Sequence, residues 1–145
     1  MLVGLAEKRT GKVIIQTYNP DNYAIMYSKK QDYDLFYKTE IDLRKKLNYP
    51  PFCDIILIRF NGKNIDEIER VSNKVYKKLM SFKTKDMWVY KPVPSPIDKI
   101  KNKYRWRIVV KCKLNSKMLD IIKLCIDEKV KDTSIIVDIN PGNMT

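Results

Sequence analysis

Residues 104–113 read Tyr-Arg-Trp-Arg-Ile-Val-Val-Lys-Cys-Lys, and this stretch decides the fold of the chain. Apolar and basic side chains alternate along it with one exception, Val109. Since neighbouring side chains on a β-strand point to opposite faces, the alternation predicts a strand with one apolar and one basic face. The apolar face would hold Tyr104, Trp106, Ile108, Val110 and Cys112. The basic face would hold Arg105, Arg107, Lys111 and Lys113.

The segments around this strand predict a domain of alternating strands and helices. In chain order they are a strand at Asp54–Phe60, a helix from Asn64 to about Phe82, a strand at Met87–Tyr90, the basic strand, a helix from Asn115 or Ser116 to about Glu128, and a strand at Thr133–Ile139. The order β-α-β-β-α-β predicts an α+β, ferredoxin-like domain, in which a four-stranded antiparallel sheet carries two helices on one face. The basic strand would then be central, with its cations in the middle of the open face.

Residues 91–103 are predicted to form a loop, because Pro92, Pro94 and Pro96 alternate with other residues and favour an extended path. The end of this loop is basic and leads directly into the central strand. Its lysines are Lys99, Lys101 and Lys103.

The first part of the chain has a different pattern. A β-branched run at residues 12–18 predicts a strand, and two helices are expected at about Asp21–Lys30 and Asp32–Leu47. The two successive prolines at Pro50 and Pro51 exclude a helix there. We therefore place a domain boundary near Pro50, which divides the chain into residues 1–49 and 50–145.

Composition restricts the classes of function. The 145 residues include 29 Lys and Arg against 17 Asp and Glu, a net charge of +12, which favours an acidic partner such as nucleic acid. The preference for lysine over arginine weakens this inference, because it is typical of AT-rich genomes. With no histidine and only three widely spaced cysteines, the chain predicts neither a zinc site nor a disulfide framework. A reduced, cytoplasmic protein without membrane spans is expected.

The cations of the central strand and its neighbours are the candidate DNA-binding residues. They are Arg105, Arg107, Lys111, Lys113, Lys99, Lys101, Lys103 and, if it also points outward, Arg59. The aromatic residues of the strand occupy the alternate positions, which point to the other face of the sheet. We therefore expect the basic face to carry charged side chains but no rings on which bases could stack. Such a face predicts contact with phosphates and little sequence preference. The sequence contains no recognisable catalytic constellation, and we expect no catalytic, cofactor-binding or metal-binding residue in it.

Several stretches between about Gly11 and Pro141 are informative when they are taken together. They are Gly11-Lys-Val-Ile-Ile-Gln-Thr-Tyr-Asn-Pro20-Asp, Phe36-Tyr-Lys-Thr-Glu40 with Leu43-Arg44, Leu47-Asn-Tyr-Pro-Pro-Phe52, Pro92-Val-Pro-Ser-Pro-Ile97, Tyr104-Arg-Trp-Arg and Val137-Asp-Ile-Asn-Pro141. In this order, the stretches resemble the C-terminal part of the primosomal protein N′ (PriA) family of bacterial replication-restart DNA helicases.

The resemblance implies that the chain is part of a larger 3′→5′ superfamily-2 helicase that reloads the replisome at stalled forks. In that family, ATP, magnesium and zinc bind in parts that lie upstream of this chain. Residues 1–10 would end the last helicase motif, residues 12–18 would be the last strand of the second helicase lobe, and the helices up to residue 49 would be a connector. Residues 50–145 would be the C-terminal domain, which is implicated in binding forked or single-stranded DNA. The implied partners also include other primosome proteins and the acidic C-terminal tail of single-stranded-DNA-binding protein.

Two other functions fit the sequence as well. The first is a ferredoxin-like RNA-binding or ribosomal-type module, which would have the same fold and charge. The second is a docking module that holds protein partners and has no affinity for DNA. A preference for forked DNA over structured RNA would exclude the first, and binding of DNA itself would exclude the second.

Overall fold

The computed structural model describes residues 14–128 and 130–143. The elements are α1 (Tyr23–Lys30), α2 (Tyr33–Lys46), β1 (Asp54–Gly62), α3 (Ile65–Ser81), β2 (Trp88–Val89), β3 (Val93–Ile100), β4 (Lys103–Cys112), α4 (Ser116–Ile126) and β5 (Thr133–Ile139). The chain divides into two compact units, Met1–Asp42 and Leu43–Thr145, and the boundary between them falls within the residue range of α2. No helix in the described ranges is long and apolar enough to cross a membrane.

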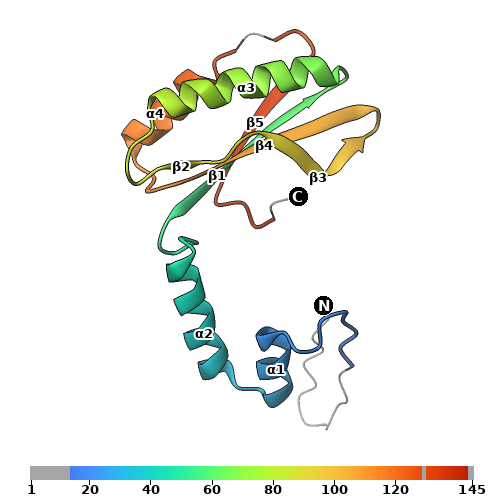
Figure 1. The fold of residues 1–145 in the computed structure, drawn as a ribbon, viewed down its shortest axis with the longest axis vertical. Coiled ribbons are helices and arrows are strands. Elements are labelled where there is room, and N and C mark those ends of the chain that lie inside the picture. The colour runs from blue at the N-terminus through green and yellow to red at the C-terminus, as the bar shows by residue number, and fades with distance from the viewer. Residues whose placement is uncertain (1–13, 129, 144–145) are drawn as a thin grey trace. The chain divides into compact units, whose positions relative to one another are not determined.

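The second unit has the predicted ferredoxin-like plan. Its sheet is antiparallel with the order β2-β4-β1-β5, and both α3 and α4 cover the same face (Figure 1). Strand β4 pairs with β1 along nine positions, from Asp54 opposite Cys112 to Gly62 opposite Tyr104. The basic strand therefore lies in the centre of the sheet, as its sequence predicts.

The apolar face of β4 packs against the helices. Ile108, Val110 and Cys112 are buried in the core, and Tyr104 and Trp106 pack against its edge. Helix α3 contributes an apolar stripe at helical spacing that includes Ile68, Val71, Val75 and Leu79. The side chain of Asn64 caps this helix by accepting hydrogen bonds from the backbone N–H groups of Asp66 and Glu67. Side-chain alternation thus assigns the inner face of β4 correctly.

The prediction of a loop at residues 91–103 is wrong. Strand β3 pairs with β4, so the sheet has five strands instead of four. A two-residue turn joins them, in which Lys101 and Asn102 have φ angles of 48° and 61°, as hairpin turns of type I′ require. The prolines are tolerated because β3 pairs on one side only and its register shifts between Pro94 and Lys99.

The predicted strand at residues 12–18 is also not found. Residues 12 and 13, together with the helicase-motif assignment of residues 1–10, lie outside the described residues. Residues 14–18 are exposed and irregular, and no strand among the described residues pairs with them. A single β-strand has no stable conformation without a neighbour to complete its hydrogen bonds. The two predicted helices do form, as α1 and α2.

A carboxylate at the start of β1 joins three segments of the domain. Asp54 accepts hydrogen bonds from the backbone N–H of Leu114, at 2.8 Å, and from the side-chain amide of Asn140, at 2.9 Å. The side-chain oxygen of Asn140 also accepts a hydrogen bond of 2.9 Å from the backbone N–H of Ile55 in β1. The hydrogen bond from Asn140 is the main cause that lowers the pKa of Asp54, and the hydrogen bond from Leu114 is the second. Both stabilise the charged form of the carboxylate.

These bonds predict a pH-dependent contribution to stability. Above the pKa of about 3.9 that an aspartate has in an unfolded chain, the ionised Asp54 is expected to stabilise the fold, and this contribution is lost as the pH falls through its lower folded-state pKa. Asp54→Asn should therefore reduce the free energy of unfolding by about 1–2 kcal/mol at pH 7. Urea unfolding of both proteins from pH 7 to pH 3 should show the difference shrinking. The exposed Asp86→Asn is the control, and a difference that did not shrink at all between pH 7 and pH 3 would contradict the assignment.

Candidate nucleic-acid interface

The sheet face opposite the helices carries a group of cations that we call the basic face: Arg59, Lys103, Arg105 and Arg107. Residues directly opposite each other in an antiparallel pair point to the same side of the sheet. Arg59 of β1 is the partner of Arg107, so it does point outward with the cations of β4. Arg105 and Arg107 are half-buried, whereas Lys103 is exposed.

Arg59 and Arg107 place two guanidinium groups directly opposite each other on this face. Asp138 of β5 forms an ion pair with Arg59, and the side chains of these two residues are 35% and 26% exposed. Arg59 is therefore paired with a carboxylate of the neighbouring strand. Guanidinium and ammonium groups gathered in this way are the donors that bind phosphate and carboxylate anions in proteins.

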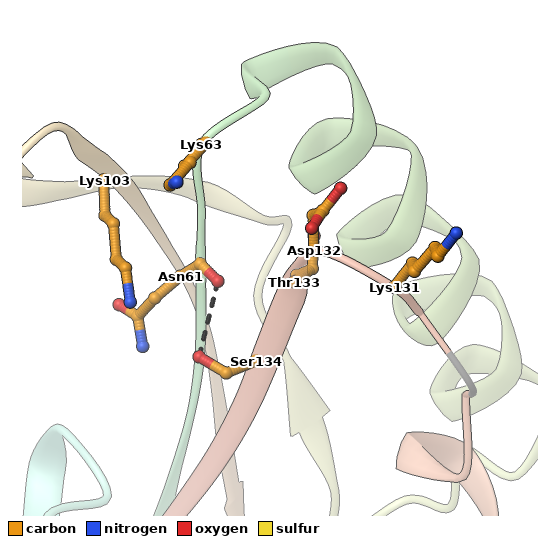
Figure 2. Close-up of a pocket in the computed structure, with 7 residues that line it drawn as sticks. All are labelled: Asn61, Lys63, Lys103, Lys131, Asp132, Thr133 and Ser134. Atoms are coloured by element: carbon orange, nitrogen blue, oxygen red, sulfur yellow. Dashed lines mark hydrogen bonds between the residues drawn. The ribbon is translucent and has the colours of Figure 1, made fainter.

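A pocket of about 310 Å³ continues the basic face at one end of β1 and β5. Its lining residues are Asn61, Lys63, Lys103, Lys131, Asp132, Thr133 and Ser134 (Figure 2). Lys103 belongs to both the pocket and the basic face, while Figure 2 shows the Lys131 ammonium pointing away from Asn61. The sequence argument missed Lys63, because it lies in the turn after β1 and has no strand parity to mark it. The pocket adds Lys63 to the positive surface around Lys103.

Lys111 does not lie on an open surface, although its parity places it on the basic side of β4. It is 6% exposed, and its Nζ donates a hydrogen bond of 3.0 Å to the carbonyl of Leu47. The same ammonium lies 3.6 Å from the centre of the Tyr49 ring. The chain that follows α2 therefore covers this end of the face, where Ile55 and Leu57 are also buried. The prediction that Lys111 is exposed to a ligand is wrong.

The other predicted cations lie apart from the basic face. The ammonium of Lys99 lies 4.8 Å from the centre of the Tyr104 ring, on the side of the sheet to which Tyr104 belongs. Lys101 occupies the turn between β3 and β4, and Lys113 is exposed just beyond the end of β4. Only Lys103, Arg105, Arg107 and Arg59 of the predicted set are brought together.

The expectation that this face lacks aromatic rings is also wrong. Trp88 is the cross-strand partner of Lys111, so it lies on the same side of the sheet as the cations. Tyr90 has the parity of Trp88, and its backbone N–H donates to the carbonyl of Val109 at 2.9 Å. The sequence shows that Trp88 and Tyr90 share one face of their segment. It does not show which face, because that depends on how β2 pairs with β4.

The three cysteines are buried, with exposures of 7% for Cys53, 1% for Cys112 and 0% for Cys125. Burial is the main cause that raises the pKa of the Cys112 thiol, to about 11, so this group is protonated at neutral pH. Within the described ranges, no three histidine, cysteine or carboxylate side chains lie close enough to bind a metal ion together.

Comparison with known proteins gives the family. The family model for the primosomal protein N C-terminal domain matches residues 45–142, from the end of α2 through the whole sheet. The chain belongs to this family. Membership in the primosomal protein N C-terminal domain family confirms the resemblance seen in the sequence.

Individual members of the family are moderately similar to the chain. The replication restart protein PriA of Borreliella burgdorferi is 38% identical over 124 residues, which are 86% of this chain and 19% of that protein. The protein of the same name from Bacillus subtilis is 30% identical over 142 residues, 94% of this chain and 18% of the relative. The Synechocystis protein is 36% identical over 101 residues, 70% of this chain and 12% of the relative. The chain thus spans about a fifth or less of the length of these relatives.

Proposed function

We propose that this chain is the C-terminal domain of a PriA-like 3′→5′ replication-restart helicase and that its basic face binds the backbone of forked and single-stranded DNA. The opposed pair Arg59 and Arg107 carries this proposal. The two guanidinium groups lie side by side on one face, where a single phosphate could contact both. Planar guanidinium groups also match phosphate oxygens in a two-pronged geometry.

The remaining parts of the proposal follow from the family. Residues 1–49 would be the end of the second helicase lobe with its connector, and residues 50–145 the DNA-binding domain. The chain itself would be non-catalytic, with ATP, magnesium and zinc bound by upstream parts of the whole protein. The whole protein would act in the cytoplasm with other primosome proteins.

The proposal predicts a strong dependence of DNA affinity on salt. Each phosphate that a cation neutralises releases condensed counterions, so log K should fall with log salt at about −0.9 per contact on duplex DNA. About four contacts would give a slope of roughly −3.6. Fluorescence anisotropy with a labelled fork between 50 and 300 mM NaCl measures this slope. Absence of binding at the lowest salt would refute the proposal, and tighter binding to structured RNA than to the fork would favour the RNA-binding module.

Docking of the acidic tail of single-stranded-DNA-binding protein is the second candidate function. The pocket that Lys63 and Lys103 help to line supports it, because ammonium groups attract carboxylates as well as phosphates. An acidic peptide that ends in phenylalanine is expected to bind weakly, and more weakly as salt rises. Isothermal calorimetry with the peptide and with a scrambled, uncharged version measures this. If neither peptide binds, docking belongs to other parts of the whole protein.

A further inference from the structure

We propose that Tyr49, Trp88 and Tyr90 form a stacking site for unpaired bases beside the basic face, so that the domain prefers single strands to duplex. This inference rests on the proposed function. The basic face would hold the phosphates of a DNA strand, and the three aromatic rings would bind the bases of the same strand. We call these three residues the aromatic site.

The aromatic site is formed by two segments that are distant in the sequence. Tyr49 follows α2, whereas Trp88 and Tyr90 come from β2 and the residue after it. All three are exposed aromatic side chains, with exposures of 39%, 40% and 48%. They gather around one buried group: the Lys111 ammonium lies 3.6 Å from the Tyr49 ring centre and 5.9 Å from the Tyr90 ring centre. Trp88 is the cross-strand partner of Lys111.

Lys111 thereby has a role other than the predicted phosphate contact. Its ammonium is held by the Leu47 carbonyl and packs against the face of the Tyr49 ring, an attraction that is stronger when the cation is removed from water. A ring fixed in this way loses less conformational entropy when a ligand stacks on it. Lys111 is a positioning residue, and the ring surface that remains exposed is what a base would contact.

The aromatic site is continuous with the basic face. Tyr90 is hydrogen-bonded to Val109, which lies two residues from Arg107 on the same side of β4. Lys111 lies four positions after Arg107, which corresponds to about 13 Å along a strand. Aromatic rings and guanidinium groups within this distance can contact the bases and the phosphates of one extended strand.

Single-stranded nucleic acid is the occupant that this arrangement favours. Proteins that bind single strands combine a cationic track for the backbone with rings on which bases stack. The bases of a duplex are stacked on one another and cannot offer their faces to a protein ring. A protein partner could also cover exposed rings, but its surface would have to supply anions opposite the arginines as regularly as a phosphate backbone does.

The test compares ligands that differ only in their bases. Oligothymidylate, an abasic oligonucleotide of equal length, a duplex and oligouridylate are titrated against the parent chain and against Trp88→Ala and Tyr90→Ala. Each variant is expected to weaken binding of both base-bearing single strands by roughly tenfold to a hundredfold. Binding of the abasic strand and of the duplex should not change, and neither should the salt slope. Tyr90→Phe should restore the affinity, and Tyr37→Ala, which removes an exposed ring of α2, is the matched control.

Fluorescence provides an independent readout. The chain has two tryptophans, so Trp106→Phe leaves Trp88 as the only one. Oligothymidylate should quench its emission, and the abasic strand should not.

The outcomes separate the two proposals. If no nucleic acid binds the parent chain, the proposed function itself fails. If all ligands bind with a salt slope but the alanine variants match the parent, only the aromatic site is refuted. The aromatic site is also refuted if the alanine variants lose affinity for the abasic strand and the duplex by the same factor as for the base-bearing single strands. A preference of the parent chain for oligouridylate over oligothymidylate would identify RNA as the strand.

Discussion

Replacing Phe60 with alanine is expected to lower the free energy of unfolding by about 3–5 kcal/mol. Phe60 lies in the middle strand β1, is 0% exposed and belongs to the core between the sheet and the helices. Its cross-strand partners are Trp106 of β4 and Ile135 of β5, so the truncation leaves a cavity that touches three strands. Such a cavity loses dispersion contacts that the surrounding backbone cannot close.

Urea unfolding measures this loss, with Phe52→Ala as the control because Phe52 is 36% exposed. The loss in the free energy of unfolding for Trp106→Ala should lie between the losses for Phe60→Ala and Phe52→Ala. Truncating a tryptophan that is fully part of the core would cost roughly 3–5 kcal/mol, but the Trp106 ring is only half-buried and packs against the edge of the core. A loss below about 1 kcal/mol for Phe60→Ala would mean that the core is assigned wrongly.

The double variant Arg105→Glu/Arg107→Glu is expected to weaken fork binding by at least about 100-fold at low salt. Each substitution removes a charge-assisted contact, typically of about 1.5–3 kcal/mol, and adds a like charge beside a phosphate. The salt slope should flatten by roughly 1.8, which corresponds to two lost contacts. Affinity should fall for all sequences alike, because phosphates carry no sequence information.

The domain should stay folded in this variant. Both side chains are only half-buried, and a glutamate at position 107 would face Arg59 with the opposite charge. Arg70→Glu/Lys77→Glu is the matched control, since it changes the net charge equally on α3, on the other side of the sheet. If both double variants weaken binding to the same extent, net charge and not the basic face drives association. Loss of the folded state would show that residues 105 and 107 have a structural role.

The pairing of β4 shows how far the sequence could predict this fold. Alternation between Tyr104 and Cys112 is a local property of the strand, so it reveals the inner face without any knowledge of the partners. The apolar stripe and the Asn64 cap of α3 are equally local. Strand β3 was missed because prolines argue against a strand unless one of its edges is free, and that condition is set by the sheet.

The candidate site depended more on tertiary structure. The sequence alone determined that β4 is central and that one of its faces is basic. Only the tertiary structure decided that Lys111 is buried, because its partner Leu47 is separated from it by 64 positions. It also decided that the rings and the arginines share one face, through the pairing of β2 with β4. The physical reason is that side-chain periodicity depends on the local backbone, whereas burial and charge balance depend on chain segments that only folding brings together.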